Sequence, residues 1–68
     1  MNVTARERQI MRLAGEGLTE REIGQRLGLS FNTVKVIKAR CRKRNGKSTA
    51  EICAWVALDD LKIEHRRD

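Results

Sequence analysis

The sequence contains no proline and no tyrosine, and its aromatic content is limited to Phe31 and Trp55. Proline is the residue that most strongly interrupts helices, and the chain is rich instead in the good helix formers Ala, Leu, Glu, Arg and Lys. A chain of 68 residues can build one small domain. We therefore expect a single all-α domain over residues 1–68.

Long apolar segments are also absent. No run approaches the roughly 20 apolar residues that a membrane-spanning helix needs, and the N-terminus lacks the apolar segment of a signal peptide. These absences predict a cytoplasmic protein without a membrane partner.

Metal ligands and catalytic groups are scarce. The sequence has two cysteines, Cys41 and Cys53, and a single histidine, His65, which are too few for a structural zinc site. No nucleophile–base set and no glycine-rich phosphate loop is evident. We expect no metal, no cofactor and no catalytic residues, and hence no enzyme. Reduced thiols that pack in the core are the favoured role of the cysteines, with redox sensing as the alternative. Trp55 is expected to pack in the core or at an interface.

Positive charge is concentrated in one segment. The formal net charge is +6, and residues 35–47, KVIKARCRKRNGK, hold seven of the fifteen Lys and Arg and no acid. A focused field of this kind suits a polyanion such as DNA. A solvated helix face is the other interpretation of such a run, so the neighbouring segments decide between the two.

Capping boxes divide the chain into helices. The pairs Thr4–Glu7, Thr19–Glu22 and Ser48–Glu51 each have the spacing with which a Ser or Thr and a Glu cap a helix N-terminus. Glycines near residues 15–17, 28 and 46 give stop signals. The predicted helices cover about 5–16, 20–27, 31–44 and 49–61, with a loose tail over about 64–68.

The second and third helices are separated only by Gly28-Leu29-Ser30, a spacing typical of a helix-turn-helix, here over about 20–39. At about 100° per residue, Val34, Ile37 and Cys41 share one side of the third helix and should face the core. The opposite side holds Asn32, Lys35, Val36, Ala39, Arg40 and Lys43. Small apolar groups among cations suit a major groove, where they can meet thymine methyls while Lys and Arg reach guanine edges or phosphates.

The segments VTARERQIMRLAGEGLTEREIGQRLGLS and Thr33-Val34-Lys35-Val36, with Ser48-Thr49-Ala50-Glu51 and the helix after it, resemble the DNA-binding domain of LuxR/FixJ-type (GerE-like) transcriptional regulators. The resemblance implies a four-helix domain that reads the major groove with its third helix and pairs through its fourth.

The resemblance also implies roles for particular residues. It places Lys35, Val36 and Ala39 where the family contacts DNA, and Thr19, Thr33 and Arg40 at usual phosphate contacts. The chain departs from the family pattern at Ile37, where His is usual, and in a shorter connection to the fourth helix. We expect Lys43 and Lys47 to contact phosphates as well.

The fourth helix carries two apolar stripes. Ile52, Val56 and Ile63 fall on one side, which should cover the core. A second stripe of mostly small residues lies nearly opposite and is expected to be a dimer interface: Ala50, Ala54, Ala57, Leu58 and Leu61. A helix that only covers a core needs one stripe, so the second favours a homodimer.

The favoured function is a stand-alone, sequence-specific transcriptional regulator, bacterial or phage-encoded and nucleoid-associated, that binds double-stranded DNA as a homodimer. The stretch VKVIKARCRKR also resembles region 4 of bacterial sigma factors. A sigma-like or adaptor module that binds RNA polymerase or another acidic protein is therefore the alternative. Nonspecific nucleic-acid binding is a third hypothesis.

Overall fold

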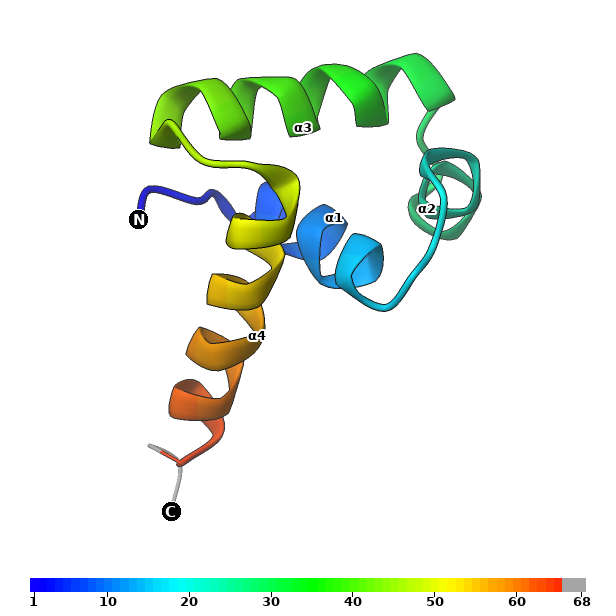
Figure 1. The fold of residues 1–68 in the computed structure, drawn as a ribbon. Helices are drawn as coiled ribbons and strands as arrows, with labels where there is room; N and C mark the ends of the chain where they lie inside the picture. Colours follow the sequence, from blue (N-terminus) through cyan, green and yellow to red (C-terminus); the bar gives the residue numbers. More distant parts are fainter. Residues whose placement is uncertain (66–68) are drawn as a thin grey trace.

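The computed structural model describes residues 1–65, which form four helices and contain no strand. The helices are α1 (Ala5–Gly15), α2 (Glu20–Leu27), α3 (Phe31–Asn45) and α4 (Thr49–His65). In Figure 1, α3 lies across the top, with α1 beneath it, α2 at one end and α4 descending from the other. The predicted all-α, four-helix fold is confirmed. No helix in the described part of the chain is both long and apolar enough to cross a membrane.

All three predicted capping boxes are formed. Thr4 Oγ1 accepts from the Glu7 backbone N–H at 3.1 Å, and Glu7 Oε1 accepts from the Thr4 N–H at 2.9 Å. The same reciprocal pair joins Thr19 to Glu22, and Ser48 to Glu51. Each box satisfies two backbone donors that a helix start leaves without partners, which is why these helices begin where the sequence predicts.

The observed end of α4 differs from the predicted end near residue 61. The helix continues to His65, so residues 64 and 65 are helical, and the rest of the predicted loose tail lies outside the described residues. No Gly or Pro follows Leu61 to stop the helix. The last turns of α4 extend beyond α1 (Figure 1). Ile63 is consequently 39% exposed, although it was expected to share the core side with Ile52 and Val56.

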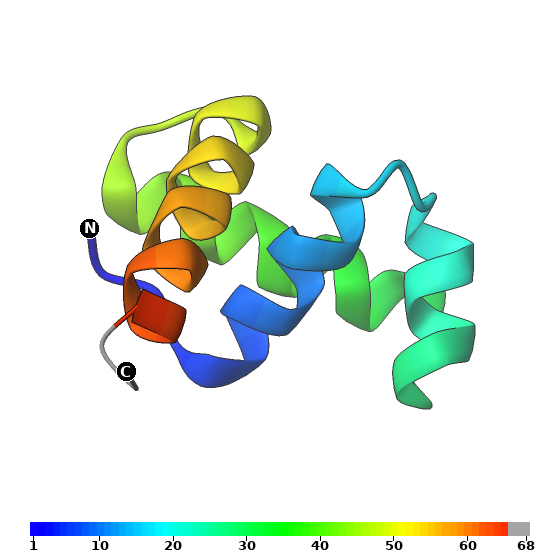
Figure 2. The same ribbon diagram turned by 90° about the horizontal axis from the view of Figure 1, so that it is seen from below.

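The buried core has two clusters. Met11, Cys41, Ile52 and Val56 form the first, with Trp55, Cys53 and Val3 packed against it. The second is formed by Ile10, Ile23 and Val34. Figure 2 shows why both include residues of α1 and α3: these two helices cross at the centre of the fold, while α2 and α4 lie on either side. The predicted packing of Trp55 and of both cysteines is confirmed.

The turn between α2 and α3 is fixed by two glycines. Gly28 ends α2 in the left-handed region, at φ 71°, which a side chain would disfavour. The buried Gly24 leaves space for the chain to turn back over α2, because a Cβ there would lie 2.5 Å from the Leu29 carbonyl oxygen. The Leu29 N–H donates to the Gly24 carbonyl at 2.8 Å. The angle between α2 and α3 therefore follows from backbone contact.

Charged side chains attach α4 to α1. Arg8 donates to Asp59 at 2.6 Å and to Asp60 at 3.0 Å, and Arg12 donates to Asp60 at 2.7 Å. The hydrogen bond from Arg12, supported by Arg8, lowers the pKa of Asp60. The Arg8 guanidinium also lies 5.4 Å from the centroid of the Trp55 ring. Together these contacts set the position of α4 along α1.

Candidate nucleic-acid interface

The two sides of α3 are arranged as predicted. Val34 and Cys41 are fully buried, and Ile37 is partly buried against the second core cluster. The residues expected on the opposite side are all exposed: Asn32, Lys35, Val36, Ala39, Arg40 and Lys43. Val36 is 46% exposed among these polar and charged side chains. The outer face of α3 is therefore both basic and partly apolar.

A shallow hollow lies on this outer face. Its volume is about 350 Å³, and it is lined by Asn32, Thr33, Val36, Ile37 and Arg40. An amide, a hydroxyl, apolar surface and a guanidinium thus meet in one place. Of the other predicted contacts, Lys35, Ala39 and Lys43 lie on the exposed face outside this hollow.

Two threonines predicted to contact phosphates lie at helix starts. Thr19 is the N-cap of α2, and its Oγ1 accepts from the Glu22 N–H at 3.2 Å. Thr33 lies in the first turn of α3, with its hydroxyl 2.8 Å from that of the N-cap Ser30. Because the Thr19 hydroxyl acts only as an acceptor in this cap, its proton can still be donated to a phosphate oxygen.

The cations of residues 35–47 fall into two groups. Lys38 pairs with Glu20 at 3.5 Å, Arg44 pairs with Glu7 at 2.7 Å, and Lys47 pairs loosely with Glu51 at 3.9 Å. Among the side chains described, those of residues 1–63, no carboxylate lies within ion-pair distance of the other four: Lys35, Arg40, Arg42 and Lys43. Lys47 is exposed, so its predicted phosphate contact would compete only with a weak pair.

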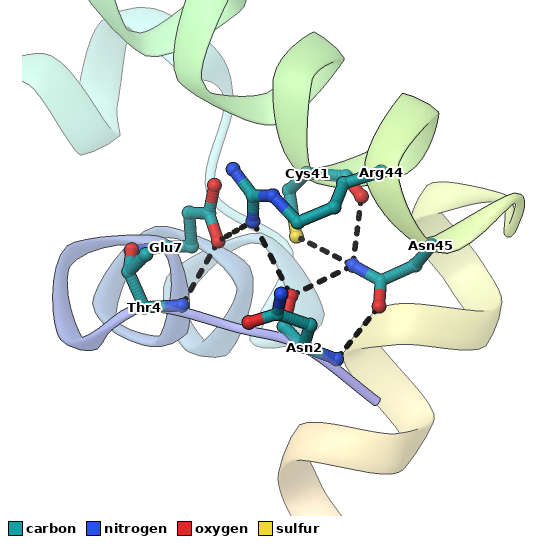
Figure 3. A network of polar contacts seen from close by, with 6 residues as sticks. All are labelled: Asn2, Thr4, Glu7, Cys41, Arg44 and Asn45. Carbon is teal, nitrogen blue, oxygen red and sulfur yellow. Dashed lines mark hydrogen bonds and ion pairs between the residues drawn. The ribbon is translucent and has the colours of Figure 1, made fainter.

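Arg44 fastens the C-terminal end of α3 to the N-terminal segment, a role that its place in a basic run does not suggest. Its Nη1 donates to Glu7 Oε1 at 2.7 Å and to the Asn2 carbonyl at 3.3 Å. Asn45 Nδ2 donates to the same carbonyl at 3.0 Å (Figure 3). Glu7 is only 4% exposed, and its hydrogen bond from Arg44 lowers its pKa. This network fixes the direction of α3.

The expected dimer stripe on α4 is exposed along its length. All five residues, Ala50, Ala54, Ala57, Leu58 and Leu61, are accessible, and the two leucines are 62% and 54% exposed. Ala54 and Ala57 also line a hollow of about 360 Å³ between α4 and the C-terminal end of α1.

The comparison with known families gives a direct result: residues 1–56 match the bacterial regulatory proteins of the luxR family. The chain belongs to the luxR family. This membership confirms the resemblance seen in the sequence, and it identifies a LuxR-type helix-turn-helix domain of DNA-binding transcription regulators.

This luxR-family chain is 40% identical over 55 residues to the nitrate/nitrite response regulator protein NarL of Escherichia coli K12. The same identity holds for NarL of Escherichia coli O6:H1. Each alignment covers 79% of the chain but 26% of NarL, so the chain spans about a quarter of the length of these curated relatives. No solved structure matches the chain significantly.

The sequence interpretation missed two residues near this interface. Phe31 is the first residue of α3, and its ring centroid lies 5.0 Å from the Arg21 guanidinium and 5.3 Å from Lys35 Nζ. The sequence could have indicated the contact between Phe31 and Lys35, because residues four positions apart on a helix are neighbours. Nothing in the sequence pairs Arg21 with Phe31, because they lie on different helices.

Proposed function

We propose that this chain is a sequence-specific, DNA-binding transcription regulator whose recognition helix, α3, enters the major groove of double-stranded DNA. The observation that carries the proposal is the exposed outer face of α3, where Val36 and Ala39 lie among cations that have no carboxylate partner within residues 1–63. α2 and the first part of α3 would form the helix-turn-helix over about residues 20–39. Family membership supports the same conclusion.

The outer face supports a division of roles. Lys35, Val36 and Ala39 would contact base edges, because a Lys can donate to guanine and small apolar groups can meet thymine methyls. Asn32 would lie at the groove edge, where its amide can donate and accept. The phosphate contacts would come from Thr19, Thr33, Arg40, Lys43 and Lys47, which add affinity without carrying sequence information directly.

We further propose that the chain binds DNA as a homodimer through the α4 stripe. Two copies related by a two-fold axis would bring small residues of the two α4 helices together, and the exposed Leu58 and Leu61 would lose their contact with water. Such a pair would present two recognition helices to half-sites about one DNA turn, roughly 34 Å, apart.

The base-reading role can be tested with sequences selected from a random DNA pool. Lys35→Ala and Val36→Ala should each reduce the preference for the selected site, the former by about 1–3 kcal/mol. Lys43→Ala is the matched control: it should weaken all sequences alike and lower the salt slope by about one. A wild-type chain that selects no sequence, but is captured by RNA polymerase, would instead support the sigma-like alternative. If neither Lys35→Ala nor Val36→Ala changes the preferred site, α3 does not read the bases.

The dimer can be tested separately with Ala54→Glu. The substitution lies on the exposed stripe, so the helical circular dichroism spectrum should be unchanged while cooperative binding to a two-half-site operator is lost. Binding of that operator by Ala54→Glu with wild-type stoichiometry and affinity would rule out pairing through α4.

A further inference from the structure

We propose that Phe31 is a positioning residue of the DNA-binding surface: its ring holds Lys35 for base contact and Arg21 for contact with a backbone phosphate. The inference rests on the proposed function and deepens it. It adds a residue of α2 to the contact surface and assigns a role to an aromatic side chain that is not part of the core.

The geometry is that of one ring shared by two cations. The Arg21 guanidinium and Lys35 Nζ lie 5.0 Å and 5.3 Å from the Phe31 centroid, within the roughly 6 Å range of a cation–π contact. Phe31 belongs to neither buried cluster and remains exposed at the start of α3. Its ring therefore contacts both cations at the surface of the domain.

The two carboxylates that flank Arg21 in the sequence already have other partners. Glu20 pairs with Lys38 at 3.5 Å, and Glu22 Oε1 accepts from the Thr19 backbone N–H at 2.8 Å. Among the described side chains of residues 1–63, neither Arg21 nor Lys35 has a carboxylate at ion-pair distance. Two like charges held on one ring repel each other, and a polyanion that approaches both would relieve this repulsion. The arrangement therefore favours a polyanion such as DNA over a neutral ligand.

The ring also restricts a flexible side chain. A free Lys samples many rotamers, and ordering it on binding reduces affinity. A Lys35 side chain that already lies on the Phe31 ring loses less freedom when it reaches a base edge. We therefore expect the ring to affect sequence preference through Lys35, whereas Arg21 should affect affinity for all sequences.

The test compares Phe31→Leu, which keeps an apolar side chain but removes the ring, with Phe31→Tyr, which keeps the ring. The readout is the affinity for the selected site divided by the affinity for scrambled DNA. Phe31→Leu should lower this ratio about two- to fivefold, as expected for an exposed cation–π contact, and Phe31→Tyr should preserve it. In a Lys35→Ala background, Phe31→Leu should have no further effect on the ratio. Arg21→Ala should leave the ratio unchanged and lower the salt slope by about one.

A measurement on the free protein tests the contact between the Phe31 ring and Lys35 separately from the proposed DNA binding. In nuclear magnetic resonance spectra of the free protein, ring currents should shift the Lys35 side-chain protons upfield in wild type and Phe31→Tyr, but not in Phe31→Leu. Absence of this shift in wild type would overturn the inference. If wild type shows no sequence preference, the proposed function fails. If wild type is specific and Phe31→Leu keeps its full ratio, only the role of Phe31 fails.

Discussion

The pair formed by Glu7 and Arg44 should make a measurable contribution to stability through its charge alone. Glu7→Gln isolates that charge, because a Gln at this position can still complete the capping box with Thr4. A hydrogen bond to a charged group stabilises a protein by about 1.5–3 kcal/mol and a neutral one by about 0.5–1.5 kcal/mol. Because Arg44 is 36% exposed, we discount the difference and expect Glu7→Gln to cost about 1 kcal/mol.

Glu7→Ala should cost more, about 2–3 kcal/mol, because it also removes the capping bond. A domain of this size has a free energy of unfolding of roughly 3–10 kcal/mol, so the change is a large share of it. Urea unfolding followed by circular dichroism at neutral pH measures both costs. Glu22→Gln is the matched control, since Glu22 completes the equivalent box on α2 but has no ion pair within 4 Å in the described chain; it should cost less than Glu7→Gln, because it removes only the charge that the capping bond stabilises.

The same pair predicts a pH dependence. Since the pKa of Glu7 is lower in the folded chain than its ordinary 4.5, its contribution is complete above the ordinary value and is lost as the pH falls through the folded value. The stability advantage of wild type over Glu7→Gln should therefore shrink and vanish in acid. Equal stability of the two proteins at pH 7, or a difference that persists unchanged into strong acid, would refute this account of the network.

Three further substitutions or reactions test other parts of the fold. Gly24→Ala should lower stability by about 1–3 kcal/mol, because its Cβ would meet the Leu29 carbonyl; an unchanged melting temperature would contradict the close approach. Asp60→Asn removes the carboxylate that Arg8 and Arg12 of α1 share and should lower the stability by about 1 kcal/mol, measured by thermal unfolding. A melting temperature equal to that of wild type would show that these ion pairs do not stabilise the fold. A thiol reagent should label Cys53 before Cys41, because Cys41 is fully buried and Cys53 is only partly buried, while burial raises the pKa of both thiols; rapid labelling of Cys41 in the native protein would contradict its orientation.

Local signals in the sequence were sufficient for most of the fold. Three of the four helix starts depend on two residues three positions apart, so Thr4 and Glu7, or Thr19 and Glu22, predict them without knowledge of the tertiary structure. The core side of α3 follows in the same way from helical spacing. The end of α4 was predicted too early, because no Gly or Pro follows Leu61 and the helix continues to His65.

The partners of individual cations could not be predicted in this way. Arg44 and Lys43 are neighbours in the same basic run, yet Arg44 meets a buried Glu7 that lies 37 positions earlier in the chain. Such a pairing depends on how α1 and α3 cross, which no local pattern encodes. The same reason explains why the contact of Arg21 with Phe31 was missed, whereas the exposed face around Val36 was predicted from periodicity alone.

The division of the core into two clusters has a consequence for the motions of the domain. α1 contributes Ile10 to one cluster and Met11 to the other, and α3 likewise contributes Val34 and Cys41. α2 and α4 each bury residues in a single cluster. Backbone amides of α1 and α3 should therefore exchange with solvent only on global unfolding, whereas those of α2 and α4 can exchange through separate local openings. α4 can thus loosen or rearrange without releasing the pair formed by α2 and α3.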